Sequence, residues 1–116
     1  MAFRLSTRAS NFLRESIRSL DELETILLLH RDTSRWWSAE QIADVLTMRA
    51  EVAARALESL AGRNLLDVRV GASLAYCCAP VHDHLFDVLS EVAVDPAAAR
   101  EVVMLSSPKA SRSVRG

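Results

Sequence analysis

Glycine, cysteine and long apolar segments are all scarce in this 116-residue chain. Its three glycines form no phosphate-binding loop, and no strand-turn-helix nucleophile motif is present, so we expect neither enzyme activity nor a cofactor. No apolar run approaches the ~20 residues that cross a bilayer, and the first residues lack the apolar core of a secretory signal. These absences favour a cytoplasmic protein without membrane contact.

The two cysteines, Cys77 and Cys78, are adjacent. Neighbouring side chains on a strand point to opposite faces, so we expect no disulfide between them, with Cys78 in the core and Cys77 on the other face of its sheet. Two alternatives stay open. Thiols and imidazoles bind zinc, and His82 and His84 follow closely, although this spacing matches no familiar zinc site. The second alternative is a redox switch through Cys77 between subunits.

Charge is distributed unevenly although the net charge is only −1. Residues 1–18 carry four arginines and one acidic residue, residues 19–100 carry seven arginines and thirteen acidic residues, and residues 101–116 carry three basic residues and one acidic residue. Nucleic-acid-binding surfaces are normally basic, so the acidic body argues against DNA. The basic ends could supply phosphate contacts through Arg4, Arg8, Arg14 and Arg18, or through Lys109, Arg112 and Arg115.

Two short helices joined by a tight turn are predicted between Ser38 and Leu66. Ser38 and Gln41 have the spacing of a capping box, and apolar residues follow at helical intervals. The pattern breaks at residues 47–49 and then resumes. We expect Gly62 to take the left-handed conformation that ends the second helix. The apolar positions of the two helices are Ile42, Val45 and Leu46, then Ala53, Ala56, Leu57 and Leu60.

A β-hairpin is predicted directly after these helices, because the apolar period changes to alternation in residues 66–70 and 74–78. A three-residue turn containing Gly71, with a bulge, places the apolar residues of both strands on one face. Trp36 and Trp37 precede the helix pair, where we expect a very short third strand with one tryptophan buried. The shared apolar face comprises Leu66, Val68, Leu74, Tyr76 and Cys78.

Four further helices are predicted around this unit. Ser10 caps a helix in residues 11–19, and Ser19 with Glu22 forms a capping box before the strongly apolar residues 20–29. After the hairpin, a helix carries Leu85, Phe86, Val88, Leu89 and Val92, and Asp95-Pro96 starts a last helix that ends near Leu105. We expect a homodimer through two apolar patches, namely Phe12, Leu13 and Ile17, and Val102, Val103 and Leu105.

Residues 19–80 resemble small bacterial winged-helix proteins that are broadly MarR-like. The resemblance lies in Trp37-Ser38-Ala39-Glu40, in Ala56-Leu57 with Leu60, and in Leu65-Leu66 after Gly62. It implies a mainly α fold with a small β-hairpin (α+β), a winged helix-turn-helix. The implied organisation is a basic, partly helical N-terminal arm (residues 1–18), the core (19–80), C-terminal helices that dimerise such regulators (81–105) and a disordered basic tail (106–116).

The resemblance implies transcriptional regulation by binding double-stranded DNA through the third helix of the core and the wing. The candidate nucleic-acid-binding residues are Arg49, Ala50 and Arg55 on that helix and Arg69 on the wing. The alternative is a non-enzymatic module that binds another protein regulator, because winged-helix domains serve both roles. The acidic core and the balanced charges of the third helix favour this alternative, so the margin for DNA is small.

Overall fold

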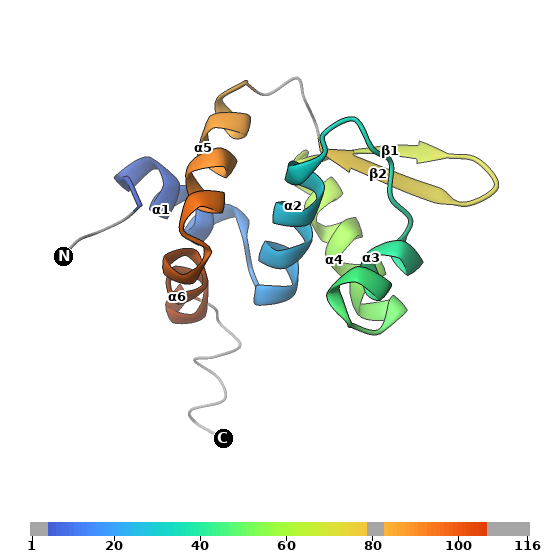
Figure 1. The fold of residues 1–116 in the computed structure, drawn as a ribbon, viewed down its shortest axis with the longest axis horizontal. Helices are drawn as coiled ribbons and strands as arrows, with labels where there is room; N and C mark the ends of the chain where they lie inside the picture. The colour runs from blue at the N-terminus through green and yellow to red at the C-terminus, as the bar shows by residue number, and fades with distance from the viewer. Residues whose placement is uncertain (1–4, 79–82, 107–116) are drawn as a thin grey trace.

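The computed structural model describes residues 5–78 and 83–106, in which six helices accompany one two-stranded antiparallel sheet. This confirms the expectation of a mainly helical α+β chain with a small hairpin. Figure 1 shows α1, α5 and α6 at one end, α3, α4 and the hairpin at the other, and α2 between them. The elements are α1 (Thr7–Ser16), α2 (Leu20–Arg31), α3 (Ala39–Leu46), α4 (Ala50–Gly62), β1 (Leu66–Val70), β2 (Leu74–Cys78), α5 (Asp83–Val94) and α6 (Pro96–Ser106).

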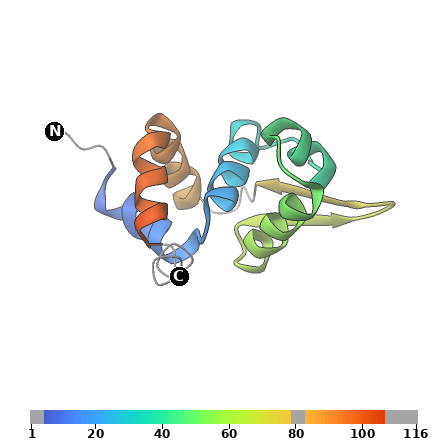
Figure 2. The same ribbon diagram turned by 90° about the horizontal axis from the view of Figure 1, so that it is seen from below.

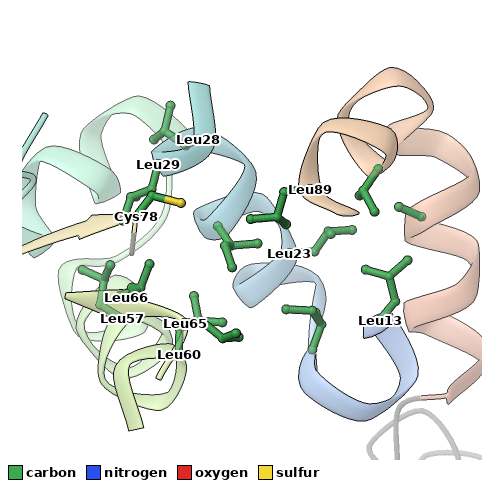
Figure 3. Packing of buried hydrophobic residues seen from close by; sticks show 14 of the residues in the cluster. Leu13, Leu23, Leu28, Leu29, Leu57, Leu60, Leu65, Leu66, Cys78 and Leu89 are labelled. Carbon is green, nitrogen blue, oxygen red and sulfur yellow. The ribbon is translucent and has the colours of Figure 1, made fainter. Parts of the chain in front are cut away.

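Helix α2 forms the centre of the hydrophobic core, as Figure 3 shows. It packs against α4 and β2 on one side and against α5 and α6 on the other. Leu23, Ile26 and Leu29 are fully buried because their spacing repeats on a face that both halves of the molecule cover. Ser19 caps the helix by accepting the N–H of Glu22 at 3.2 Å. The predicted capping box is only half formed, since the Glu22 carboxylate accepts the N–H of Arg18 instead.

Helix α1 begins earlier than predicted. Its cap is Ser6, not Ser10, and the Ser6 hydroxyl accepts the N–H of Ala9 at 3.1 Å. The same hydroxyl donates to Glu91 on α5 at 2.9 Å, which ties the helix start to the C-terminal helices. This cap was not predicted for two reasons. The buried stripe starts at Leu5, before the predicted helix of residues 11–19, and Glu91 is distant in sequence. The stripe comprises Leu5, Ala9, Leu13 and Ile17.

The two apolar patches predicted to form a homodimer pack within one chain instead. Helix α1 lies against α5 and α6, and Leu13, Ile17 and Val103 belong to one buried cluster. Phe12 and Val102 are partly buried against that cluster. Most of the predicted dimer surface is therefore the internal contact of the arm with α6, and only Leu105 of the set is largely exposed, at 85%.

The ends of α3 follow the predicted chemistry. Ser38 and Gln41 form the complete capping box: the Ser38 hydroxyl accepts the Gln41 N–H at 3.2 Å, and the Gln41 amide oxygen accepts the Ser38 N–H at 2.9 Å. Thr47 ends the helix in the left-handed conformation, with φ of 57°. The N–H of Met48 then reaches the carbonyl of Ala43 at 3.0 Å, which closes the turn toward α4.

The end of α4 corrects the prediction for Gly62. Gly62 is the last residue of the helix and has no positive φ, whereas Asn64 has φ of 64°. The N–H of Leu65 donates to the carbonyl of Leu60 at 3.1 Å. This bond buries Leu60 and Leu65 together, and it requires the left-handed residue directly before Leu65. Packing of the leucines, not the glycine, thus sets the exit from the helix.

The hairpin has the predicted three-residue turn of Gly71, Ala72 and Ser73. Its register runs from Leu66 opposite Cys78 to Val70 opposite Leu74 without interruption, so the predicted bulge is absent from the paired residues. Trp37 exchanges two backbone hydrogen bonds of 2.8 Å with Tyr76, which is the predicted third strand reduced to one bridge. Trp37 is the buried tryptophan, at 5% exposure.

Candidate recognition surface

Three of the four predicted nucleic-acid-binding residues lie on α4 or at its N-cap. Arg49, Ala50 and Arg55 are all exposed, while Ala53, Ala56, Leu57 and Leu60 form the buried stripe of the helix. Arg49 occupies the N-cap position and makes no side-chain capping bond. The structure therefore places Arg49 and Ala50 at the N-terminal end of α4 and Arg55 on its exposed face.

Acidic side chains share this face. Glu51 and Glu58 are exposed and lie one helical turn on either side of Arg55, at spacings of four and three residues. Residues at these spacings are neighbours on a helix surface. The positive potential around Arg55 is therefore reduced on both sides, and the face does not present a continuous basic stripe.

Arg69, the fourth predicted residue, is engaged within the hairpin region. Its guanidinium lies over the ring of Trp36, 4.4 Å from the ring centroid. A second such contact has Arg35 over Trp37 at 3.8 Å. A cation over an aromatic face is held there electrostatically. The structure thus places Arg69 against Trp36 on the sheet rather than in the group on α4.

Arg63 is another arginine of α4's C-terminal region that does not serve the surface. Its guanidinium holds the Glu22 carboxylate through two bonds, of 2.8 and 3.2 Å, and also donates to the carbonyl of Ser16 and the hydroxyl of Ser59. Burial raises the pKa of Glu22, but the hydrogen bonds from Arg63 and from the Arg18 N–H outweigh it, so the net pKa is lowered. No sequence signal predicted this pair, because its residues are 41 apart.

In the described part of the basic N-terminal arm, α1 packs on α5 and α6, and only its last residue, Ser16, contacts the C-terminal end of α4 through Arg63. Figures 1 and 2 both show α1 beside α5 and α6, on the far side of α2 from α3 and the hairpin. Arg8 and Arg14 are exposed there, and Arg14 donates to Asn11 at 3.1 Å. The arm therefore does not extend the α4 face with positive charge. The other basic residues proposed for this purpose, Arg4, Lys109, Arg112 and Arg115, lie outside the described residues.

Cys77 has the environment of an unreactive thiol. It is only 5% exposed, and its thiol donates to the carbonyl of Thr33 at 3.0 Å. Burial, with a further contribution from the Asp67 carboxylate, raises the pKa of Cys77, and a protonated buried thiol is a poor nucleophile. Cys78 is buried on the core face, as predicted, and both cysteines are free.

Within residues 5–78 and 83–106, no three His, Cys, Asp or Glu side chains are grouped to hold a metal ion. The candidate ligand His82 and the side chain of His84 lie outside the described part of the chain. One open depression of about 210 Å³ is lined by Leu27, Leu28, Leu46, Ala93 and Pro96 with Glu24, Arg31 and Arg100. Glu24 pairs with Arg100 there at 2.9 Å, so this cation is already compensated.

Two features of the surface were missed by the sequence analysis. His30, near the end of α2, contacts α5: its Nε2 lies 3.2 Å from the Ser90 hydroxyl, and its ring is 4.8 Å from that of Phe86. Burial lowers the pKa of His30. The hairpin tip is apolar and exposed, with Val68 at 45%, Val70 at 78% and Leu74 at 44%. Alternation predicted the shared face of Val68 and Leu74 but not that the core ends at Tyr76.

Comparisons with protein-family models, with curated proteins and with solved structures find no match. None of the helices in the described ranges combines the length and apolarity needed to cross a bilayer.

Proposed function

We propose that residues 19–80 form a winged helix-turn-helix. Several observations on residues 20–78 support this assignment. The order is a helix, a one-residue bridge strand, two helices in contact and a hairpin that pairs with the bridge. A capped α3 and a left-handed Thr47 set the tight turn into α4. This is the order in which the resemblance places the two core helices and the wing.

We infer that the exposed face of α4 docks a protein partner with a basic surface, as in regulation through another regulator. The charge inventory of α3, α4 and the hairpin carries this inference. Five exposed acidic residues oppose three exposed arginines, because Arg63 is paired with Glu22. One of the three, Arg69, stacks on Trp36. The acidic residues are Glu40, Asp44, Glu51, Glu58 and Asp67.

DNA binding by the same face is the second candidate. The observation that favours it is the exposed N-terminal end of α4, which carries Arg49 and Arg55 where a recognition helix contacts base edges. The small number of basic side chains on this face counts against DNA binding, because affinity for DNA depends largely on phosphate neutralisation by such side chains. Arg8 and Arg14 belong to α1, which packs on α5 and α6, and they do not add to this face.

A fluorescence-anisotropy titration with mixed-sequence duplex DNA, at low salt and across a salt series, separates the two candidates. Protein docking predicts no binding by the wild type even at low salt. The matched variant Glu51→Lys/Glu58→Lys removes the acidic neighbours of Arg55 and should then bind DNA with a steep salt dependence. Tight, salt-sensitive binding by the wild type, weakened by Arg49→Ala or Arg55→Ala, would replace docking with DNA binding.

Photo-cross-linking tests docking directly. A photoreactive residue at Glu58 on α4, compared with one at Asp21 on α2, reports which face a bound protein covers. We expect a cross-linked product specific to position 58 that Glu51→Lys abolishes. Equal cross-linking from both positions would show that α4 is not the docking face.

A further inference from the structure

Within the described residues, the outer edge of β1 pairs with no other strand, and the pairing of β2 shows which residues of β1 direct their backbone N–H and C=O groups outward. Tyr76 exchanges both of its backbone hydrogen bonds with Trp37, so its N–H and C=O point away from β1. Tyr76 and Val68 are therefore a non-hydrogen-bonded pair of the hairpin, and the N–H and C=O of Val68 point away from β2. Alternation gives Leu66 and Val70 the same orientation. The edge of β1 can accept another strand at these three residues.

All side chains of this edge except that of Leu66, which is buried in the core, are exposed, and charges of one sign do not protect them. Asp67 to Val70 are all exposed, and Figure 2 shows the hairpin projecting past the helices. Edge strands usually carry features that prevent pairing, such as like charges or proline. Here Asp67 and Arg69 carry opposite charges on either side of Val68.

The sequence Leu66-Asp67-Val68-Arg69-Val70 is complementary to itself in the antiparallel direction. With Val68 opposite the same residue of a second strand, Asp67 faces Arg69 of the second copy, and Arg69 faces Asp67. These are non-hydrogen-bonded positions, where side chains are closest. Leu66 faces Val70, so apolar residues meet on the other side of the sheet. In this register the outward backbone groups face each other, opposite charges are paired and apolar side chains are paired.

We propose that β1 is the homodimer interface of this chain, in which two β1 strands pair antiparallel about a twofold axis at Val68. The partner is a second copy, because only a strand with the same alternation of charges satisfies both Asp67 and Arg69. Addition of a strand to an exposed sheet edge is a common recognition mode, and a twofold interface uses the same patch on both subunits. The pairing also covers part of the exposed apolar face formed by Val68, Val70 and Leu74.

One contact must change on association. The Arg69 guanidinium lies over Trp36 in the single chain, on the side of β1 that faces β2 and the Trp37 bridge. It has to leave Trp36 to reach Asp67 of the second copy. The ion pair replaces a cation–aromatic contact, which lowers the net gain on association. Because only the five residues of β1 pair, the interface is also small, and we expect a modest affinity.

Sedimentation equilibrium of the full chain tests the proposal, from about 10 µM to about 500 µM, where small interfaces associate. We expect reversible dimerisation by the wild type. Asp67→Arg and Arg69→Asp each place like charges opposite one another in both symmetry-related pairs, and each should weaken dimerisation at least about tenfold. Mixed in equal amounts, the two variants should form a heterodimer, because one edge is then wholly positive and the other wholly negative. The double variant Asp67→Arg/Arg69→Asp should dimerise as the wild type does.

The control variant Glu51→Lys/Glu58→Lys changes charge on α4 and should leave dimerisation unchanged, which separates this interface from the docking face. Circular dichroism confirms that each exposed substitution leaves the chain folded. A monomeric wild type at the highest concentration would overturn the proposal. So would dimers that persist in both single variants, or a mixture of the two variants that stays monomeric.

Discussion

Replacing Arg63 should destabilise the chain far more than replacing a surface arginine. Arg63→Met removes four donated hydrogen bonds that join the end of α1, the start of α2 and the end of α4. It leaves the Glu22 carboxylate, whose side chain is 9% exposed, with the Arg18 N–H among its remaining donors. An uncompensated buried charge costs about 3–5 kcal/mol.

The lower end of this range applies, because the Arg63 side chain is 18% exposed and water can partly replace it. We therefore expect Arg63→Met to lose about 3 kcal/mol of unfolding free energy. For a chain of this size that corresponds to a fall in melting temperature of about 12 °C. Urea denaturation followed by far-UV circular dichroism measures the free energy. The matched control is Arg55→Met, an exposed arginine of α4 about two turns before Arg63, which should change the unfolding free energy by less than about 0.5 kcal/mol.

The double variant Glu22→Gln/Arg63→Met isolates the ion pair. Neutralising Glu22 removes the unpaired charge, so the double variant should be more stable than Arg63→Met alone. The pH dependence supplies a second signature. The folded pKa of Glu22 lies below its ordinary value of 4.5, so its contribution is complete above that value and is lost as the pH falls through the folded pKa. Glu22→Gln should reduce this acid loss. An Arg63→Met protein as stable as the control, or a double variant less stable than Arg63→Met, would refute the assigned role of the pair.

Three further predictions concern single positions. Thr47→Asn should stabilise the chain by about 0.5–1 kcal/mol in urea denaturation, because a β-branched residue at φ of 57° is strained and asparagine tolerates this conformation; no gain would mean that the Thr47 side chain is held there by favourable contacts. Burial lowers the pKa of His30, so the unfolded chain binds more protons and stability should fall as the pH drops below about 6.5; His30→Gln should lessen that fall, and an unchanged pH profile would contradict it. Cys77 should react with a thiol reagent much more slowly in the folded chain than in urea, and equal rates would contradict its burial.

Local signals in the sequence predicted the elements near the proposed recognition surface well. The Ser38 capping box, the three-residue turn and the Trp37 bridge depend on residues close in sequence or on strand parity, and all are confirmed. The start of α1 depends on Ser6 bonding to Glu91, 85 residues away. The end of α4 depends on which leucines are buried together. Such contacts become visible only when the chain is folded, and no local pattern encodes them.

The sequence predicted the acidic excess of the core correctly, but it could not show where each charged side chain lies in the folded chain. It offered the N-terminal arginines as compensation for an acidic core, yet α1 packs on α5 and α6, away from α4. It also counted Arg63 and Arg69 equally with Arg55, although one holds Glu22 and the other covers Trp36. The electrostatic character of a face depends on which cations remain uncommitted after folding. For α4 that leaves Arg49 and Arg55 among acidic neighbours.

Dimerisation through β1 would strengthen the docking of a partner on α4. Pairing of two β1 edges would place two α4 faces on one particle, related by the same twofold axis. A partner that is itself dimeric could then engage both faces, and the second contact would form at a high effective concentration. Weak docking at the α4 face would thereby gain affinity without any added contact. The gain should vanish in Asp67→Arg, which keeps α4 intact but separates the copies, and should return when Arg69→Asp is mixed with it. Loss of avidity with unchanged affinity of a single face would link the edge of β1 to the function of α4, whereas equal binding by dimer and monomer would show that the two surfaces act independently.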